Sequence, residues 1–212
     1  MSHETMQVEV YADVVCPWCF IGARRLASVV AERGDMAVEV TYRPYLLDPT
    51  TPPEGVDLKA RLRAKYGVDP VTMFGRVEAE ARAEGIPLDL MKVERTYSSL
   101  KALTLVRSAP TAAQGAAMMD SFYTHYFIDG GGLWEPGPLV GIAARHGLEP
   151  ARGEALLADA AELDRTRRLA EQAGARGIRG VPFFVFDGML AVSGAQPREV
   201  FGQVIDKVLA ER

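Results

Sequence analysis

Two cysteines mark the point where the N-terminal sequence changes from a strand pattern to a helix pattern. Polar and apolar residues alternate over residues 7–15, which is typical of a β-strand. The Cys-Pro-Trp-Cys motif of residues 16–19 follows directly, and apolar residues then recur at helical spacing until Gly34 ends the helix. Pro17 suits the first helical turn, where the backbone N–H that proline lacks has no intrahelical partner. Alternation returns over residues 38–45, so this part is expected to form strand, loop, helix and strand.

The rest of the chain divides into a helical middle and a mixed C-terminal part. From residue 57 to residue 175, apolar residues recur at helical spacing in several segments that glycines and prolines separate. A strand pattern returns over residues 181–186, and the Asp-Gly pair that follows predicts a hairpin to a second strand. Residues 197–209 then carry the pattern of an amphipathic helix. The simplest architecture is one α/β domain that a helical insertion divides in sequence.

Composition narrows the class of partner. Of the 212 residues, 48% are hydrophobic, which is enough for a core, and the formal net charge is −4. The sequence has no concentrated basic patch, so nucleic acid is not an expected partner. No apolar run approaches the roughly 18 residues of a membrane span, and the N-terminal residues lack the pattern of a secretory signal. We therefore expect a cytoplasmic protein that does not act at a membrane.

The two cysteines are expected to be catalytic. The cytoplasm keeps thiols reduced, so a lone pair there binds metal or reacts. A structural zinc needs four ligands, and His3, His125 and His146 lack the spacing of ligands, so no metal site is predicted. At the start of a helix, unpaired N–H groups and the partial positive charge stabilise a thiolate. Cys16 would be the exposed attacking thiol and Cys19 the buried thiol that resolves a mixed disulfide.

Three other residues near this chemistry each have two interpretations. Trp18 is either an aromatic platform for an extended peptide or packs on a neighbouring loop. Asp13 is either a buried proton acceptor or a strand-end residue that binds backbone. Pro182 either forms a cis peptide bond with Val181 that holds a substrate backbone beside the cysteines, or is a trans proline that opens an edge strand.

Three motifs carry a resemblance to a known family. They are residues 14–22 (Val-Val-Cys-Pro-Trp-Cys-Phe-Ile-Gly), 177–186 (Gly-Ile-Arg-Gly-Val-Pro-Phe-Phe-Val-Phe) and 193–197 (Ser-Gly-Ala-Gln-Pro). In this order they resemble the FrnE-like branch of the DsbA family. The resemblance implies an α/β fold, namely a thioredoxin fold interrupted by an all-helical insertion. The expected division is residues 1–56 and 176–212 for the thioredoxin-like domain and 57–175 for the insertion.

The resemblance also implies roles for particular residues. Cys16 and Cys19 would form the redox pair, and Pro182 would be the cis-proline. Partners would be protein or small-molecule thiols and disulfides, with glutathione among the small molecules, and no cofactor is expected. The residues expected to contact substrate are Pro17, Trp18, Val181 and Pro182.

Two departures from related proteins limit the mechanism. Some FrnE-like proteins have a second cysteine motif, whereas this chain has no third cysteine, so no internal second disulfide takes part. The dipeptide between the cysteines is Pro-Trp rather than the Pro-His of periplasmic DsbA, so no titratable cation lies there. We expect a reduction potential between those of thioredoxin and DsbA, about −270 and about −120 mV.

Two other functions compete with disulfide exchange. The 2-hydroxychromene-2-carboxylate isomerases and kappa-class transferases resemble this fold and use glutathione. They usually carry serine at the position of Cys16 and lack the second cysteine. A binding module without catalytic activity would also tend to lose the pair. The presence of both cysteines argues against each alternative.

Overall fold

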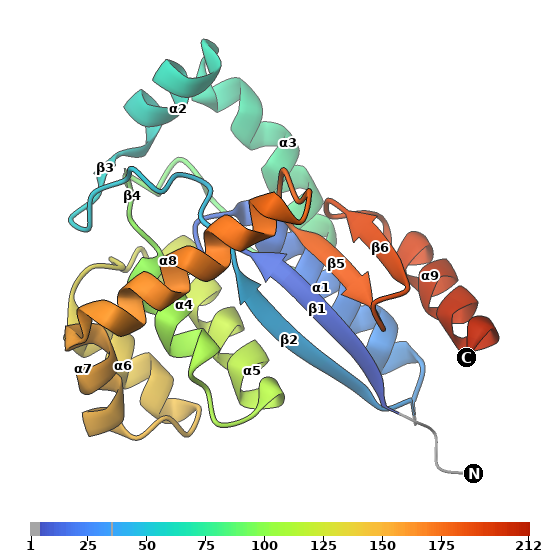
Figure 1. Cartoon of the computed structure of the whole chain (residues 1–212). Coiled ribbons are helices and arrows are strands. Elements are labelled where there is room, and N and C mark those ends of the chain that lie inside the picture. The colour runs from blue at the N-terminus through green and yellow to red at the C-terminus, as the bar shows by residue number, and fades with distance from the viewer. Residues whose placement is uncertain (1–4, 35) are drawn as a thin grey trace.

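The main sheet joins the two ends of the chain. The computed structural model describes residues 5–34 and 36–212, so His3 lies outside the described residues. Four strands form the sheet in the order β2-β1-β5-β6 (Figure 1). They are β1 (Met6–Ala12), β2 (Val38–Pro44), β5 (Phe183–Phe186) and β6 (Leu190–Ser193). β1 pairs parallel with β2 and antiparallel with β5, and β5 pairs antiparallel with β6.

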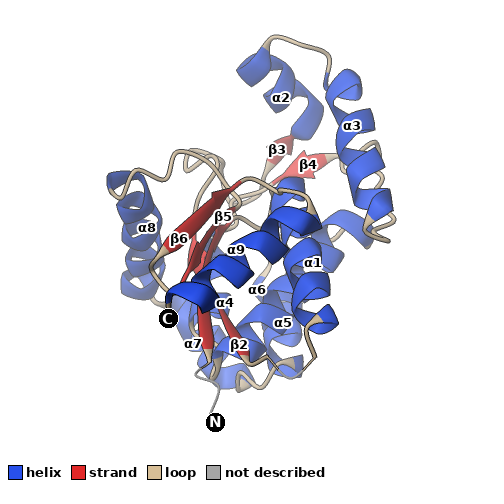
Figure 2. Ribbon diagram, turned by 90° about the vertical axis from the view of Figure 1, so that its right-hand side faces the viewer, coloured by secondary structure: helices blue, strands red, loops and turns tan. Residues whose placement is uncertain are grey.

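Helices cover both faces of this sheet. α1 (Pro17–Glu32) and α9 (Arg198–Glu211) pack against each other on one face (Figure 2). Phe201 of α9 meets Phe184 of β5 edge to face, with ring centroids 4.8 Å apart. α8 (Ala160–Ala175) lies on the other face, where its Ala173 clusters with Tyr11 of β1. The fold is therefore the thioredoxin fold that the resemblance implies.

The segment between β2 and α8 is helical with one exception. Val56–Asp57 (β3) and Arg95–Thr96 (β4) form a short antiparallel ladder, which corrects the expectation of an all-helical insertion. Two-residue strands leave no alternation that a sequence pattern could reveal. The predicted boundaries at residues 57 and 175 stay a prediction. The helical elements are α2 (Leu58–Tyr66), α3 (Pro70–Ala83), α4 (Leu100–Arg107), α5 (Ala112–Tyr123), the π-helical turn η1 (Thr124–Ile128), α6 (Pro136–Arg145) and α7 (Pro150–Ala158).

The inserted helices and the sheet share one hydrophobic core. Phe20 of α1 stacks on Tyr123 of α5, with ring centroids 5.0 Å apart and ring planes 17° apart. The ring of Phe127 in η1 also stacks on Phe20, with ring centroids 6.2 Å apart. Through these ring contacts, α5 and η1 fix the position of the first turn of α1. Across residues 5–34 and 36–212, every helix is too short or too polar to cross a membrane.

Candidate active site

Cys16 stands at the beginning of α1. β1 ends at Ala12, and the N–H of Cys16 donates to the carbonyl oxygen of Asp13 at 3.2 Å. Cys16 has extended backbone angles (φ −99°, ψ 108°) and occupies the N-cap position, with Pro17 as the first helical residue. The N–H of Cys19 donates to the carbonyl oxygen of Cys16 at 3.0 Å. The predicted order of strand, cysteine loop and helix is therefore confirmed.

The sulfur of Cys16 faces the segment that precedes β5. Its Sγ atom lies 3.8 Å from the carbonyl oxygen of Val181. The peptide bond between Val181 and Pro182 is cis, as the first interpretation of this proline requires, whereas its contact with a substrate backbone stays a prediction. Two motifs that lie 165 residues apart in sequence thus form one site.

Both thiols are buried, which corrects the expectation that Cys16 is exposed. The exposed fraction is 3% for Cys16 and 1% for Cys19, and neither forms a disulfide. The sulfur of Cys16 is covered because it packs against the Val181 carbonyl. Burial raises the pKa of Cys19 well above that of a free thiol, and the neighbouring Cys16 thiol raises it further. Both effects favour the protonated form of the Cys19 thiol.

Asp13 fixes the backbone that precedes the cysteines. Its Oδ2 accepts the N–H of Leu47 at 2.7 Å, and its Oδ1 accepts the N–H of Val15 at 3.3 Å. Burial raises the pKa of this carboxyl, whereas the hydrogen bonds, led by that from Leu47, act in the opposite direction. These contacts match the second interpretation of Asp13, in which the carboxylate binds backbone N–H groups at the end of a strand. Asp13 thereby ties the cysteine loop to the loop that follows β2.

Trp18 lies next to the inserted helix α3. The ring is half-buried against the core, and the guanidinium of Arg76 on α3 stands 5.9 Å from its centroid. Trp18 therefore packs on a neighbouring element and keeps part of its surface accessible. Arg76 carries no signal in the sequence, because its position over Trp18 depends on how α3 folds back onto α1.

Gly22 is a site residue that the sequence analysis missed. A Cβ atom at this position would lie 3.0 Å from Cζ of Phe184 and 3.1 Å from Cγ of Pro182. The glycine therefore allows Pro182 to lie directly against α1, one helical turn after Cys19. The available signal was a glycine within a helical pattern, which lowers helix stability and so marks a close approach.

Two of the three histidines considered as zinc ligands, His125 and His146, have other partners. Nε2 of His125 lies 3.1 Å from the carbonyl oxygen of Gly132, and Nε2 of His146 lies 2.8 Å from Oγ of Ser121. Within the described parts of the chain, no cluster of three or more histidine, cysteine or acidic side chains is arranged to hold a metal ion.

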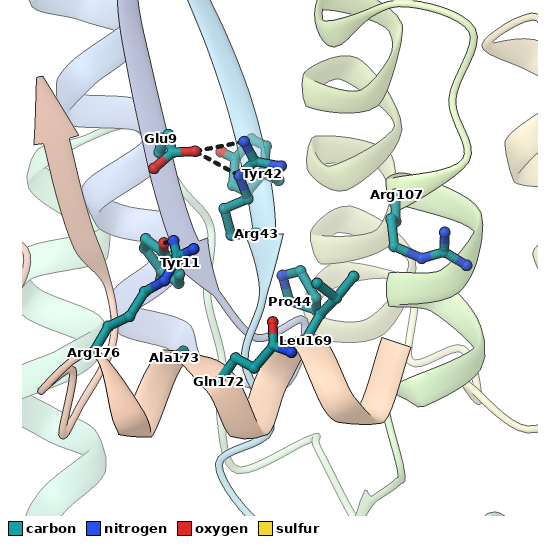
Figure 3. A pocket seen from close by; sticks show the side chains of 10 residues that line it. All are labelled: Glu9, Tyr11, Tyr42, Arg43, Pro44, Arg107, Leu169, Gln172, Ala173 and Arg176. Carbon is teal, nitrogen blue, oxygen red and sulfur yellow. Dashed lines mark hydrogen bonds and ion pairs between the residues drawn. The ribbon is translucent and has the colours of Figure 1, made fainter. Parts of the chain in front are cut away.

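One cavity lies between α8 and the sheet, and a smaller cavity beside α2 reaches the cysteine loop. A cavity of about 200 Å³ separates α8 from β1 and β2 (Figure 3). Its charged groups are already paired: Glu9 accepts from Nε of Arg43 at 2.8 Å, and Arg176 donates to the hydroxyl of Tyr11 at 3.0 Å. A smaller cavity of about 90 Å³ lies beside α2, where Asp13 contributes to its wall. The second cavity is the one that borders the cysteine loop.

Comparison with known proteins agrees with this geometry. The family model of the DSBA-like thioredoxin domain matches residues 7–206. A probable DsbA oxidoreductase from Streptomyces coelicolor is 33% identical, with a TM-score of 0.85 over 98% of this chain and 91% of that chain. No significant match is found among curated proteins.

Two more distant structures share the fold. A 2-hydroxychromene-2-carboxylate isomerase has a TM-score of 0.71 at 18% identity, over 97% of each chain. The cytosolic disulfide reductase DsbM of Pseudomonas aeruginosa, solved with GSH, has a TM-score of 0.62 at 19% identity, over 96% of this chain and 99% of that chain. At these identities the likeness concerns the fold alone. From the domain match and the Streptomyces structure, the chain belongs to the DsbA-like family of thiol–disulfide oxidoreductases.

Proposed function

We propose that this protein exchanges disulfides with protein or small-molecule thiols through Cys16 and Cys19, with Cys16 as the attacking thiol. The observation that carries the proposal is the position of Cys16 at the start of α1, with its Sγ 3.8 Å from the Val181 carbonyl oxygen. The start of a helix favours a thiolate, and the thiolate is the nucleophile in exchange. Cys19 is buried one turn further on, within reach of the same sulfur.

The exchange proceeds in two steps that balance in electrons. The thiolate of Cys16 attacks one sulfur of a substrate disulfide, forms a mixed disulfide and releases the other substrate sulfur as a thiolate. Cys19 then loses its proton and attacks Sγ of Cys16, which releases the second substrate thiolate. The products are a reduced substrate and a disulfide between Cys16 and Cys19. An external dithiol or two molecules of glutathione restore the pair, so no cofactor is required.

The proposed substrate surface lies on both sides of Cys16. Pro17 and Trp18 form one side, and Val181 and Pro182 form the other. An extended substrate segment would run along Val181 as an added strand, because the backbone there precedes β5. The half-buried ring of Trp18 supplies an apolar contact. A cytoplasmic location is part of this proposal.

The glutathione-dependent isomerase is the competing function. It uses glutathione as a cofactor and leaves the redox state of the protein unchanged, so it has no use for Cys19. The presence of both thiols at one helix start favours disulfide exchange instead.

Reduction of insulin by dithiothreitol, followed by turbidity, tests the proposal. Wild-type protein is expected to accelerate the reaction, and Cys16→Ser is expected to reduce it to the uncatalysed rate. Circular dichroism of the variant controls for folding. Equal rates for wild type and variant would contradict the proposal. Turnover of 2-hydroxychromene-2-carboxylate with glutathione, in the absence of insulin reduction, would favour the isomerase.

A further inference from the structure

A buried arginine on α1 holds a loop beside the site. Nε of Arg25 donates to Glu84 Oε1 at 2.8 Å, and Nη1 donates to the carbonyl oxygen of Ala195 at 2.7 Å. The same guanidinium also binds Glu80 on α3, and only 6% of the Arg25 residue is exposed. Arg25 therefore binds α3 on one side and the loop between β6 and α9 on the other.

The loop that Arg25 holds is the loop that holds Pro182. The N–H of Gly194 donates to the carbonyl oxygen of Pro182 at 2.8 Å, one residue before the Ala195 carbonyl that Arg25 binds. Pro182 in turn follows Val181, whose carbonyl oxygen faces the sulfur of the attacking cysteine. Two hydrogen bonds thus connect the guanidinium to the backbone edge of the site.

One face of α1 carries all the contacts involved. Cys19, Gly22 and Arg25 follow at intervals of three, so each is a neighbour of the next on the helix surface. At Gly22 the helix approaches both Pro182 and the loop: a Cβ there would be 3.1 Å from Cγ of Pro182 and 3.5 Å from Cα of Ala195. The resolving thiol, the closely packed proline and the arginine are therefore placed by a single rigid element.

Through α3, Arg25 is also connected to the Trp18 side of the site. Glu84 ends α3 and accepts from Arg198 at 2.6 Å as well as from Arg25. The same helix carries Arg76, whose guanidinium lies over the ring of Trp18. Hence Arg25 links the Trp18 side of the substrate surface to the Pro182 side.

The burial of a charge at this position calls for a reason beyond stability. Replacing a buried ion pair by well-packed apolar residues is often neutral or stabilising, whereas a guanidinium fixes several acceptors in one plane. Arg25 fixes two carboxylates and a backbone carbonyl in this way. Arg25 thereby fixes the position of the loop between β6 and α9 relative to α3.

We propose that Arg25 is a positioning residue for disulfide exchange with extended peptides, because it sets the loop of residues 193–197 and thereby the Val181–Pro182 edge relative to Cys16. This inference rests on the proposed function. Exchange with a peptide bound along the Val181–Pro182 edge depends on where that edge lies. Exchange with a small disulfide that contacts only the Cys16 sulfur does not.

The experiment compares Arg25→Met with a matched variant on the same helix. Arg33 also binds a carboxylate, Asp206 at 2.5 Å, and a backbone carbonyl, Gly202 at 2.9 Å. Both of those acceptors belong to α9, and Arg33 lies at the opposite end of α1 from Cys16. Arg33→Met therefore removes a similar pair of contacts and leaves those of the loop of residues 193–197 unchanged.

Each variant is assayed with insulin and with 5,5′-dithiobis(2-nitrobenzoate). Arg25→Met is expected to lower kcat/KM for insulin about tenfold, as for the loss of one well-aligned backbone hydrogen bond, and to leave the rate with the small disulfide unchanged. Arg33→Met is expected to change neither rate. If Arg25→Met does not fold, Arg25→Lys replaces it, since lysine keeps the charge but cannot hold all the acceptors together.

The outcomes separate this inference from the function on which it rests. If wild-type protein reduces neither substrate, the proposed function is wrong. If wild-type protein is active but both rates fall equally in the Arg25 variant, or if the Arg33 variant shows the same selective loss, the positioning role is overturned.

Discussion

The Sγ atom of Cys16 lies 3.8 Å from the carbonyl oxygen of Val181, and the pairing of two strands explains why. β1 runs antiparallel to β5, with Tyr11 opposite Phe183. The residues that follow β1 therefore meet the residues that precede β5 at one end of the sheet. The cysteine loop leaves the first strand there, and the Val181–Pro182 segment enters the second.

This placement leads to a trapping prediction for Cys19→Ser. The variant keeps the attacking thiol but lacks the thiol that resolves the mixed disulfide, so substrates should accumulate as covalent adducts on Cys16. Serine has a similar volume and fits the buried position of Cys19. Non-reducing electrophoresis of lysate incubated with the variant measures the adducts, and Cys16→Ser serves as the control. Adducts of equal amount on both variants would contradict the assigned roles.

The reduction potential is expected to lie between about −270 and about −120 mV. A helix start stabilises negative charge in general, and Cys16 occupies the N-cap position of α1. No titratable cation stands between the cysteines to stabilise it further. Equilibration with glutathione buffers, followed by quantification of free thiols, gives the value. A potential outside this window would show that another group controls the thiolate.

Local patterns were sufficient to predict most of the elements. The change from strand to helix at Cys16 depends on neighbouring residues alone. The same holds for the hairpin between β5 and β6, where Asp187 and Gly188 have φ angles of 48° and 70°. An Asp-Gly pair is suited to these angles, so the turn could be predicted without knowledge of the fold.

Features that depend on distant residues were not predictable. Burial of Cys16 depends on a carbonyl 165 residues away, and the environment of Trp18 depends on Arg76 of α3. Arg25 resembled one of many charged residues on a helix until its partners at Glu84 and Ala195 were known. Each of these contacts joins segments whose relative position only the complete fold determines.

Gly22→Ala is expected to destabilise the protein by about 1 kcal/mol, because crowding in the core costs more than alanine gains as a helix former. The added methyl group would meet Phe184 at 3.0 Å and Pro182 at 3.1 Å. Gly141→Ala in α6 is the control, since among the described residues no atom beyond the adjoining backbone of α6 lies within 4 Å of the new Cβ, and it should be neutral or stabilising. Urea unfolding measures both variants. A shift of the same sign and size in the two would contradict the close packing at Gly22.

The ion pair at Glu84 predicts a pH dependence of stability. Burial raises the pKa of this carboxyl, but the hydrogen bonds from Arg25 and Arg198 outweigh it, so the pKa lies below its ordinary value of 4.5. A lowered pKa contributes stability that is present above 4.5 and is lost as the pH falls through the lowered value. The stability difference between wild type and Glu84→Gln should therefore be largest near neutral pH and shrink in acid. Urea unfolding across this range tests it, and a difference that grows in acid would contradict the assignment.

Tyr123→Phe is expected to stabilise the protein. The hydroxyl of Tyr123 is buried and makes no hydrogen bond within residues 5–34 and 36–212, and an unpaired buried hydroxyl costs about 1–3 kcal/mol. Phenylalanine keeps the ring that stacks on Phe20, so a gain of about 1 kcal/mol in the free energy of unfolding should follow. Tyr126→Phe is the matched control, since its buried hydroxyl donates to the carbonyl oxygen of Arg95 at 3.0 Å and its loss should destabilise. Thermal unfolding of the two variants should therefore give shifts of opposite sign, and a lower Tm for Tyr123→Phe would show that its hydroxyl has a partner in solution.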